Sequence, residues 1–192
     1  MAALPTIATV QPQGTTASTI WTVGHSTRPL DVFLNLLLHF RLEAVADVRR
    51  FPESRRQPQY ASAALCRSLA EHGISYRWFP ALGGRRRPQL HSQNIAWRNA
   101  SFRGYADHIE SAEFAEGLSD LLEFCARQRT TLMCAEVLWW RCHRALIADV
   151  LRVRGIEVVH ILDAQHVAVH PYTSAARIVD GRLSYRHAES KR

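Results

Sequence analysis

Reactive side chains are concentrated in one short segment of the sequence, Cys134–Arg144, which reads CAEVLWWRCHR. Cys134 ends an apolar run that is typical of a buried strand, and a helical pattern begins soon afterwards, at Cys142. A thiol near a helix N-terminus loses its proton more readily, because unpaired N–H groups and the positive end of the helix dipole stabilise the thiolate. Arg141 and Arg144 add to this positive field. We therefore expect Cys134 to act as a nucleophile towards sulfur, phosphorus or electrophilic carbon.

The same segment allows two other interpretations. A metal ion such as zinc or iron could be held by Cys134, Cys142 and His143. Glu136 or His25 would then supply a further ligand, although the spacing matches no standard zinc ribbon or finger. Alternatively, both cysteines are buried structural thiols and a glutamate–arginine pair caps the helix. If the segment is catalytic, Glu136 and His143 join Cys134 in the catalytic set.

Polar residues also follow two earlier apolar runs of the sequence. His25 and Ser26 come directly after TIWTVG, Asp47 is the fifth residue of the run EAVADV, and Arg49 directly follows that run. A histidine at such a position can move protons or bind an anion, so His25 is a candidate general acid or base and Ser26 a candidate ligand of the anion. Asp47 and Arg49 are two residues apart in an extended segment, so they share one side and can form an ion pair that orders the site.

Positive charge is concentrated in one part of the chain. The whole sequence has a net charge of +7, whereas residues 54–106 contain nine arginines and one glutamate, a net charge of +8. Arginine forks bind phosphate in a bidentate manner, so an anionic small molecule, a nucleotide or a nucleic acid is the expected partner. We expect Arg49 and Arg144 to clamp the anion. The arginines expected at the mouth of the site are Arg55, Arg56, Arg85, Arg86 and Arg87.

Two readings of this charge compete with an enzyme site. The arginines and the aromatic residues between them have the composition of a nucleic-acid groove, which would suit a non-catalytic binding module. Equally, the arginines could form a solvated face over core aromatics. Composition does not decide between these readings.

The candidate site residues are far apart in the sequence, so the fold must bring them together. The sequence pattern predicts that strands and helices alternate along the chain. Buried strands are expected at 19–24, 43–48, 74–79, 130–134 and 156–162; helices at 30–40, 61–72, 111–127 and 142–154; a long connection at 80–104; and a hairpin at 176–185. Such alternation predicts an α/β three-layer sandwich with a central, mostly parallel sheet. Ligands of such folds bind outside the carboxyl ends of the strands, where the polar residues named above fall.

Length and composition limit the remaining possibilities. The chain has 192 residues, 47% hydrophobic and 21% charged, which is ordinary for one globular domain and excludes wholesale disorder. We expect a disordered tail at 1–18 and a single domain at 19–187. No apolar run approaches a membrane span and no secretory signal is visible, so a cytoplasmic protein without a membrane partner is expected. Cys66 and Cys125 are expected to be inert core thiols.

Taken together, these motifs resemble a family of uncharacterised proteins, DUF488. The matching segments are TVGHSTRPLDVF, VADVRRFPESRRQPQY, LGGRRRP, WRNASFRGYADH, MCAEVLWWRCHRALIADVLRVRGIEVVHI and HPYTSAAR. The resemblance implies an α/β fold and a set of site residues, but no agreed reaction. In one departure, the loop between CAE and CHR often holds a proline in the family and here reads VLWWR.

A more distant pattern is similar to the rhodanese-like domain. In that domain the cysteine after the late strand carries sulfur, and its position corresponds to Cys134. A phosphatase type of the same topology places an arginine six residues after its cysteine. Here that position is Trp140 and the arginine follows at 141, so the phosphatase pattern is not matched.

Overall fold

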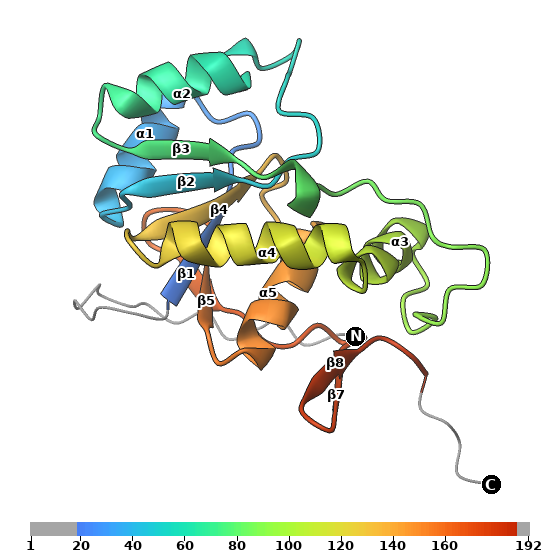
Figure 1. Cartoon of the computed structure of the whole chain (residues 1–192). Helices are drawn as coiled ribbons and strands as arrows, with labels where there is room; N and C mark the ends of the chain where they lie inside the picture. The colour runs from blue at the N-terminus through green and yellow to red at the C-terminus, as the bar shows by residue number, and fades with distance from the viewer. Residues whose placement is uncertain (1–18, 188–192) are drawn as a thin grey trace, which may run out of the picture.

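The computed structural model describes residues 19–187, and the tail expected at 1–18 lies outside the described residues. At its centre is a six-stranded sheet in the order β3-β2-β4-β1-β5-β6 (Figure 1). The strands are β1 (Thr19–Gly24), β2 (Ala44–Asp47), β3 (Ser75–Trp78), β4 (Thr130–Cys134), β5 (Glu157–Ile161) and β6 (Val167–Val169). All neighbours are parallel except β6, which is antiparallel to β5.

Helices cover both faces of this sheet. The α-helices are α1 (Leu30–His39), α2 (Ser62–Ala70), α3 (Ala100–Ile109), α4 (Ala112–Cys125) and α5 (Arg144–Val153). Short 3-10 helices lie at Pro58–Tyr60, Pro80–Leu82 and Trp139–Arg141. The sheet separates α1 and α2 from α4 and α5 (Figure 1), so the predicted three-layer α/β sandwich is confirmed.

The two cores follow from the alternation of side chains along each strand. In β2, Val45 packs with the apolar side of α1 and α2, whereas Ala46 packs with that of α4 and α5. Phe33 and Leu37 of α1 are fully buried, as expected for apolar residues one helical turn apart. A mostly parallel sheet buried on both faces therefore holds the ends of β1, β2 and β4 in fixed positions.

Local signals set several boundaries as predicted. The Ser111 side chain accepts a hydrogen bond from the Phe114 amide at 3.2 Å and so caps α4. The hairpin forms between β7 (Arg177–Val179) and β8 (Arg182–Ser184). Its turn residues, Asp180 and Gly181, both have positive φ, as a two-residue hairpin turn requires.

The sequence-based prediction was wrong at three places. The expected connection at 80–104 ends in α3, because Asn99 accepts hydrogen bonds from the amides of Ser101 and Phe102 and caps a helix there. A sixth strand, β6, was not expected, since three residues are too short to show a pattern. Cys66 is exposed rather than buried. Cys125 is partly buried, and burial raises the pKa of its thiol to about 11.

No helix in the described part of the chain is long and apolar enough to cross a bilayer.

Candidate functional site

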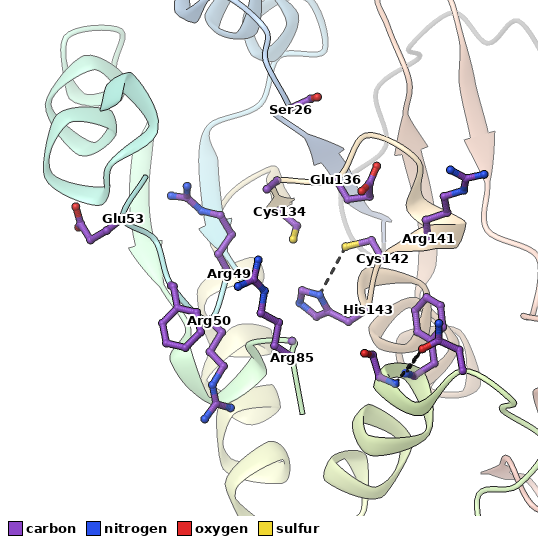
Figure 2. A pocket seen from close by; sticks show the side chains of 16 residues that line it. Ser26, Arg49, Arg50, Glu53, Arg85, Cys134, Glu136, Arg141, Cys142 and His143 are labelled. Carbon is purple, nitrogen blue, oxygen red and sulfur yellow. Dashed lines mark hydrogen bonds between the residues drawn. The ribbon is translucent and has the colours of Figure 1, made fainter. Parts of the chain in front are cut away.

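A cavity of about 570 Å³ opens beyond the carboxyl ends of β1, β2 and β4 (Figure 2). Six residues predicted from the sequence line it, from four separate segments of the chain: Ser26, Arg49, Arg85, Cys134, Glu136 and His143. Cys142, predicted only as a metal ligand, lines it as well. The polar residues that follow the strands therefore do converge, as expected for a parallel sheet.

Two thiols and one imidazole meet in this cavity. Cys134 is the last residue of β4, and Cys142 precedes α5 by two positions. Their sulfur atoms and a ring nitrogen of His143 lie within 4.8 Å of one another. The His143 Nε2 bonds the Val48 carbonyl oxygen at 2.9 Å, so Nδ1 faces the Cys142 sulfur at 3.6 Å (Figure 2). A Cβ at Gly84 would lie only 2.6 Å from this Nδ1, so the backbone there also confines the ring.

Arg144 is buried directly beside Cys142, with 1% of the residue exposed. Its guanidinium donates to the Thr22 hydroxyl at 3.3 Å, to the carbonyl oxygens of Glu136 and Val137, and to the Cys142 sulfur at 3.4 Å. No carboxylate within residues 19–187 forms an ion pair with it. An arginine keeps its charge in proteins, and a buried charge without a partner is costly. Of the groups that it contacts, only Cys142 can become an anion.

The two thiols differ in acidity. Burial opposes ionisation of Cys142, but a hydrogen bond with Cys134 and the neighbouring His143 and Arg144 outweigh it and hold the pKa of Cys142 well below that of a free thiol. The hydrogen bond with Cys142, together with burial, raises the pKa of Cys134 well above its ordinary value. Both directions favour ionisation of Cys142 over ionisation of Cys134.

At the cavity wall, Arg49 forms the predicted ion pair with Asp47, which does not itself line the cavity. Arg49 Nη2 lies 2.6 Å from Asp47 Oδ2, and Nε contacts both carboxylate oxygens. His25 accepts a hydrogen bond from Arg49 at 3.3 Å, donates through Nδ1 to the Ser26 carbonyl at 2.9 Å and stacks on Tyr60. Burial lowers the pKa of His25 to about 4. His25 thus orients Arg49 from behind and does not line the cavity.

The rim of the cavity carries an excess of positive charge. Four arginines line it, Arg49, Arg50, Arg85 and Arg141, against two glutamates, Glu53 and Glu136 (Figure 2). Ser26 and Arg85 have φ angles of 47° and 57°, a left-handed conformation that is unfavourable for residues with a side chain. Such strain persists where surrounding structure enforces it and is common at functional sites.

Several residues predicted for the mouth of the site lie elsewhere. Arg55 and Arg56 are exposed in the loop before the 3-10 helix at Pro58–Tyr60, and neither they nor Arg86 and Arg87 line the cavity. Arg86 turns away because its guanidinium binds Glu113 at 2.9 Å and the Gly83 carbonyl oxygen at 3.1 Å. A run of consecutive arginines points in different directions, so only the first of the three, Arg85, reaches the cavity.

Sequence reasoning left part of the lining out of the predicted site: Arg50, Phe51, Glu53, Gly84, Asn99, Ser101, Phe102, Ala135 and Arg141. Three of these belong to the start of α3, which was predicted as loop. The cap signal of Asn99 followed by helically spaced apolar residues could have located that helix. Among the aromatic residues expected to form a nucleic-acid groove, Tyr60, Phe79 and Tyr105 are buried in the core, whereas Trp78 is exposed and Phe102 lines the cavity.

Cys134, Cys142 and His143 are also the one set among the described residues whose geometry could hold a metal ion. Two sulfur atoms and one imidazole nitrogen suit zinc or iron, with a fourth position left for another ligand. Glu136 is exposed and His25 turned away, so neither is placed as that ligand.

Comparison with known proteins identifies a family but no activity. The family model described as "Domain of unknown function DUF488" matches residues 29–151, well over half of the 192 residues. No curated protein matches the chain. No solved structure matches it either, so the rhodanese-like topology stays a prediction. The chain belongs to the DUF488 family.

Proposed function

We propose that this protein is a cysteine-dependent enzyme that acts on an anionic substrate. The observation that carries the proposal is the contact between the buried Arg144 guanidinium and the Cys142 sulfur at 3.4 Å, with no carboxylate paired to that arginine. A fully buried permanent cation beside a thiol stabilises the thiolate, and the thiolate is the reactive form of cysteine. The thiolate lies in a cavity large enough for a small molecule.

In this proposal the nucleophile is Cys142, not Cys134. The Cys142 thiolate forms a bond with the electrophilic atom of the substrate, the bond from that atom to its leaving group breaks, and the leaving group departs with the bonding electrons and a proton. His143, whose Nδ1 faces that sulfur at 3.6 Å, and the Cys134 thiol are the nearest groups that can give or take a proton. The rim arginines Arg50, Arg85 and Arg141 bind the negative charge of the substrate.

The substrate class follows from the charge and size of the site. Besides the paired Arg49, three arginines line the cavity against two glutamates and favour an anion, and arginine forks favour phosphate or carboxylate groups. A nucleotide, free or at the end of a strand, fits this description. A non-catalytic nucleic-acid module would instead use the exposed Arg55, Arg56 and Arg87, and its binding would be unchanged by Cys142→Ser.

Alkylation of the wild-type protein tests the proposal. At pH 7, iodoacetamide should modify Cys142 about tenfold faster than the exposed Cys66, because a low-pKa thiol is mostly ionised whereas an ordinary one is not. Peptide mapping by mass spectrometry separates the four thiols, and AMP or inorganic phosphate should slow the reaction of Cys142 alone. Labelling of Cys142 no faster than that of Cys66 would overturn the proposal.

A metal centre is a second candidate, and one observation favours it. His143 donates its Nε2–H to the Val48 carbonyl oxygen at 2.9 Å, the type of contact that fixes a metal-binding histidine, and this leaves Nδ1 free beside Cys142. Elemental analysis of the purified protein decides: zinc or iron at one equivalent, lost in Cys142→Ser, supports the metal centre. Protein with neither metal near stoichiometry rejects it.

A further inference from the structure

A chain of buried hydrogen bonds leads from Arg144 away from the cavity. In the sheet, Thr22 of β1 is in register with His160 of β5, and the Thr22 hydroxyl lies 2.6 Å from His160 Nδ1. His160 Nε2 lies 2.9 Å from Nδ1 of His170, whose Nε2 lies 2.9 Å from Asp149 Oδ1. All five residues are 0–1% exposed. We call this chain, Arg144–Thr22–His160–His170–Asp149, the relay.

The chemistry of its two ends limits the directions of the hydrogen bonds in the relay. A guanidinium only donates and a carboxylate only accepts. Thr22 accepts from Arg144, and we assign its hydroxyl proton to the hydrogen bond with Nδ1 of His160. His160 must then carry its proton on Nε2 and donate to His170, which in turn donates to Asp149. With this assignment both histidines are neutral, and burial together with the charge of Arg144 lowers the pKa of His160 in agreement.

The far end of the relay is firmly held. Asp149 also accepts hydrogen bonds from the Thr173 amide and hydroxyl and from the Tyr185 hydroxyl, at 2.6–2.9 Å. Trp139 stacks on the His160 ring with centroids 4.3 Å apart and planes 7° apart, in the loop between Cys134 and Cys142. The relay is thus closed to solvent, so it can orient Arg144 but offers no path for proton exchange with water.

We propose that the relay is a positioning device: it holds the Arg144 guanidinium against the Cys142 sulfur and supplies, at Asp149, the negative charge that this buried cation lacks nearby. Thr22, His160, His170 and Asp149 are positioning residues and do not contact substrate. The inference rests on the proposed role of Cys142. It gives a role to two histidines and one carboxylate of the core, His160, His170 and Asp149 of α5, which the proposed chemistry does not use.

Isosteric threonine variants provide the test. Thr22→Val removes the hydroxyl that joins Arg144 to His160, and Thr22→Ser restores it. The matched control is Thr131→Val, because Thr131 is equally buried on the adjacent strand and its hydroxyl has no hydrogen-bond partner. The readout is the ratio of Cys142 modification rates by iodoacetate and by iodoacetamide at one pH, because only the anionic reagent is attracted by Arg144.

We expect the ratio to fall about threefold in Thr22→Val and to be recovered in Thr22→Ser, with Thr131→Val equal to wild type. A general loosening of the fold would change both reagents alike. The tautomers give an independent readout: long-range ¹H–¹⁵N spectra of the wild type should show His160 and His170 protonated only on Nε2.

Two results would overturn the relay: equal ratios in Thr22→Val and Thr131→Val, or an Nδ1–H tautomer at either histidine. Failure of the proposed function is recognised separately, because wild-type Cys142 would then react no faster than Cys66 with iodoacetamide. The tautomer readout stands whatever the reactivity of Cys142.

Discussion

Two buried arginines flank the cavity, and their surroundings differ. Arg49, at the end of β2, is 6% exposed and forms a close ion pair with Asp47, two residues away. Arg144, at the start of α5, is 1% exposed and contacts a sulfur, carbonyl oxygens and a hydroxyl, and no carboxylate within residues 19–187 forms an ion pair with it. Both adjoin a neutral histidine, His25 directly and His160 through Thr22.

The difference indicates which of the two guanidinium charges still lacks an anionic partner. The charge of Arg49 is neutralised by Asp47 whether or not a ligand is bound, so this arginine builds the wall of the cavity and keeps Nη1 turned to His25. The charge of Arg144 faces Cys142 without a carboxylate between them. A buried ion pair serves structure, whereas a buried cation beside an ionisable sulfur serves reactivity.

The largest expected effect comes from removing the ion-pair partner of Arg49. Asp47→Asn leaves a buried guanidinium unpaired, so the free energy of unfolding should fall by about 3–5 kcal/mol in urea titrations. Asp120→Asn is the control, since its ion pair with Arg77 is exposed and should contribute less than about 1 kcal/mol. Equal losses in the two variants would contradict a structural role for the Arg49 pair.

The next largest effect is expected when the Arg144 cation itself is removed. Arg144→Met removes the cation that stabilises the Cys142 thiolate, so modification of Cys142 by iodoacetamide at pH 7 should slow about 30-fold. Arg141→Met, on the rim, should slow it less than about threefold, because an exposed charge is screened. Comparable slowing in both variants would contradict a specific role of Arg144 in stabilising the Cys142 thiolate.

A smaller effect concerns the histidine beside Arg49. Because the pKa of His25 is about 4 in the folded protein and about 6.5 when unfolded, the unfolded chain binds the extra proton first. The stability contributed by neutral His25 is therefore complete above pH 6.5 and is lost as the pH falls to 4, by about 3 kcal/mol.

The measurement is urea unfolding across this pH range for wild type and His25→Gln. The wild type should lose more stability towards pH 4 than the variant does, whereas the exposed His72→Gln should follow the wild type. Parallel curves for all three proteins would contradict the assignment of a neutral, buried His25.

The smallest expected effect sharpens the boundary of the site. Arg55→Ala and Arg56→Ala change exposed side chains that do not line the cavity, so the free energy of unfolding should change by less than about 0.5 kcal/mol. The Cys142 modification rate should stay within about twofold of wild type, since salt screens exposed charges beyond about 10 Å. A tenfold loss in Cys142 reactivity would place these arginines in the site after all.

The sequence alone determined the layered fold and the edge of the sheet at which the site lies. Alternating strands and helices are local patterns, and parallel strands necessarily bring their carboxyl ends together. The Asp47–Arg49 ion pair was predictable for the same reason, because residues two apart in an extended segment share a side.

Only the tertiary structure decided which cysteine is the more acidic and what holds its cation. Arg144 meets Thr22 from 122 positions away, and Thr22 meets His160 from 138, because β1 lies between β4 and β5 in the sheet. Strand order and register arise from packing of the whole domain, and no local pattern encodes them. The tertiary structure also decided which way Arg85, Arg86 and Arg87 point, because contacts distant in sequence, such as that of Arg86 with Glu113, hold them.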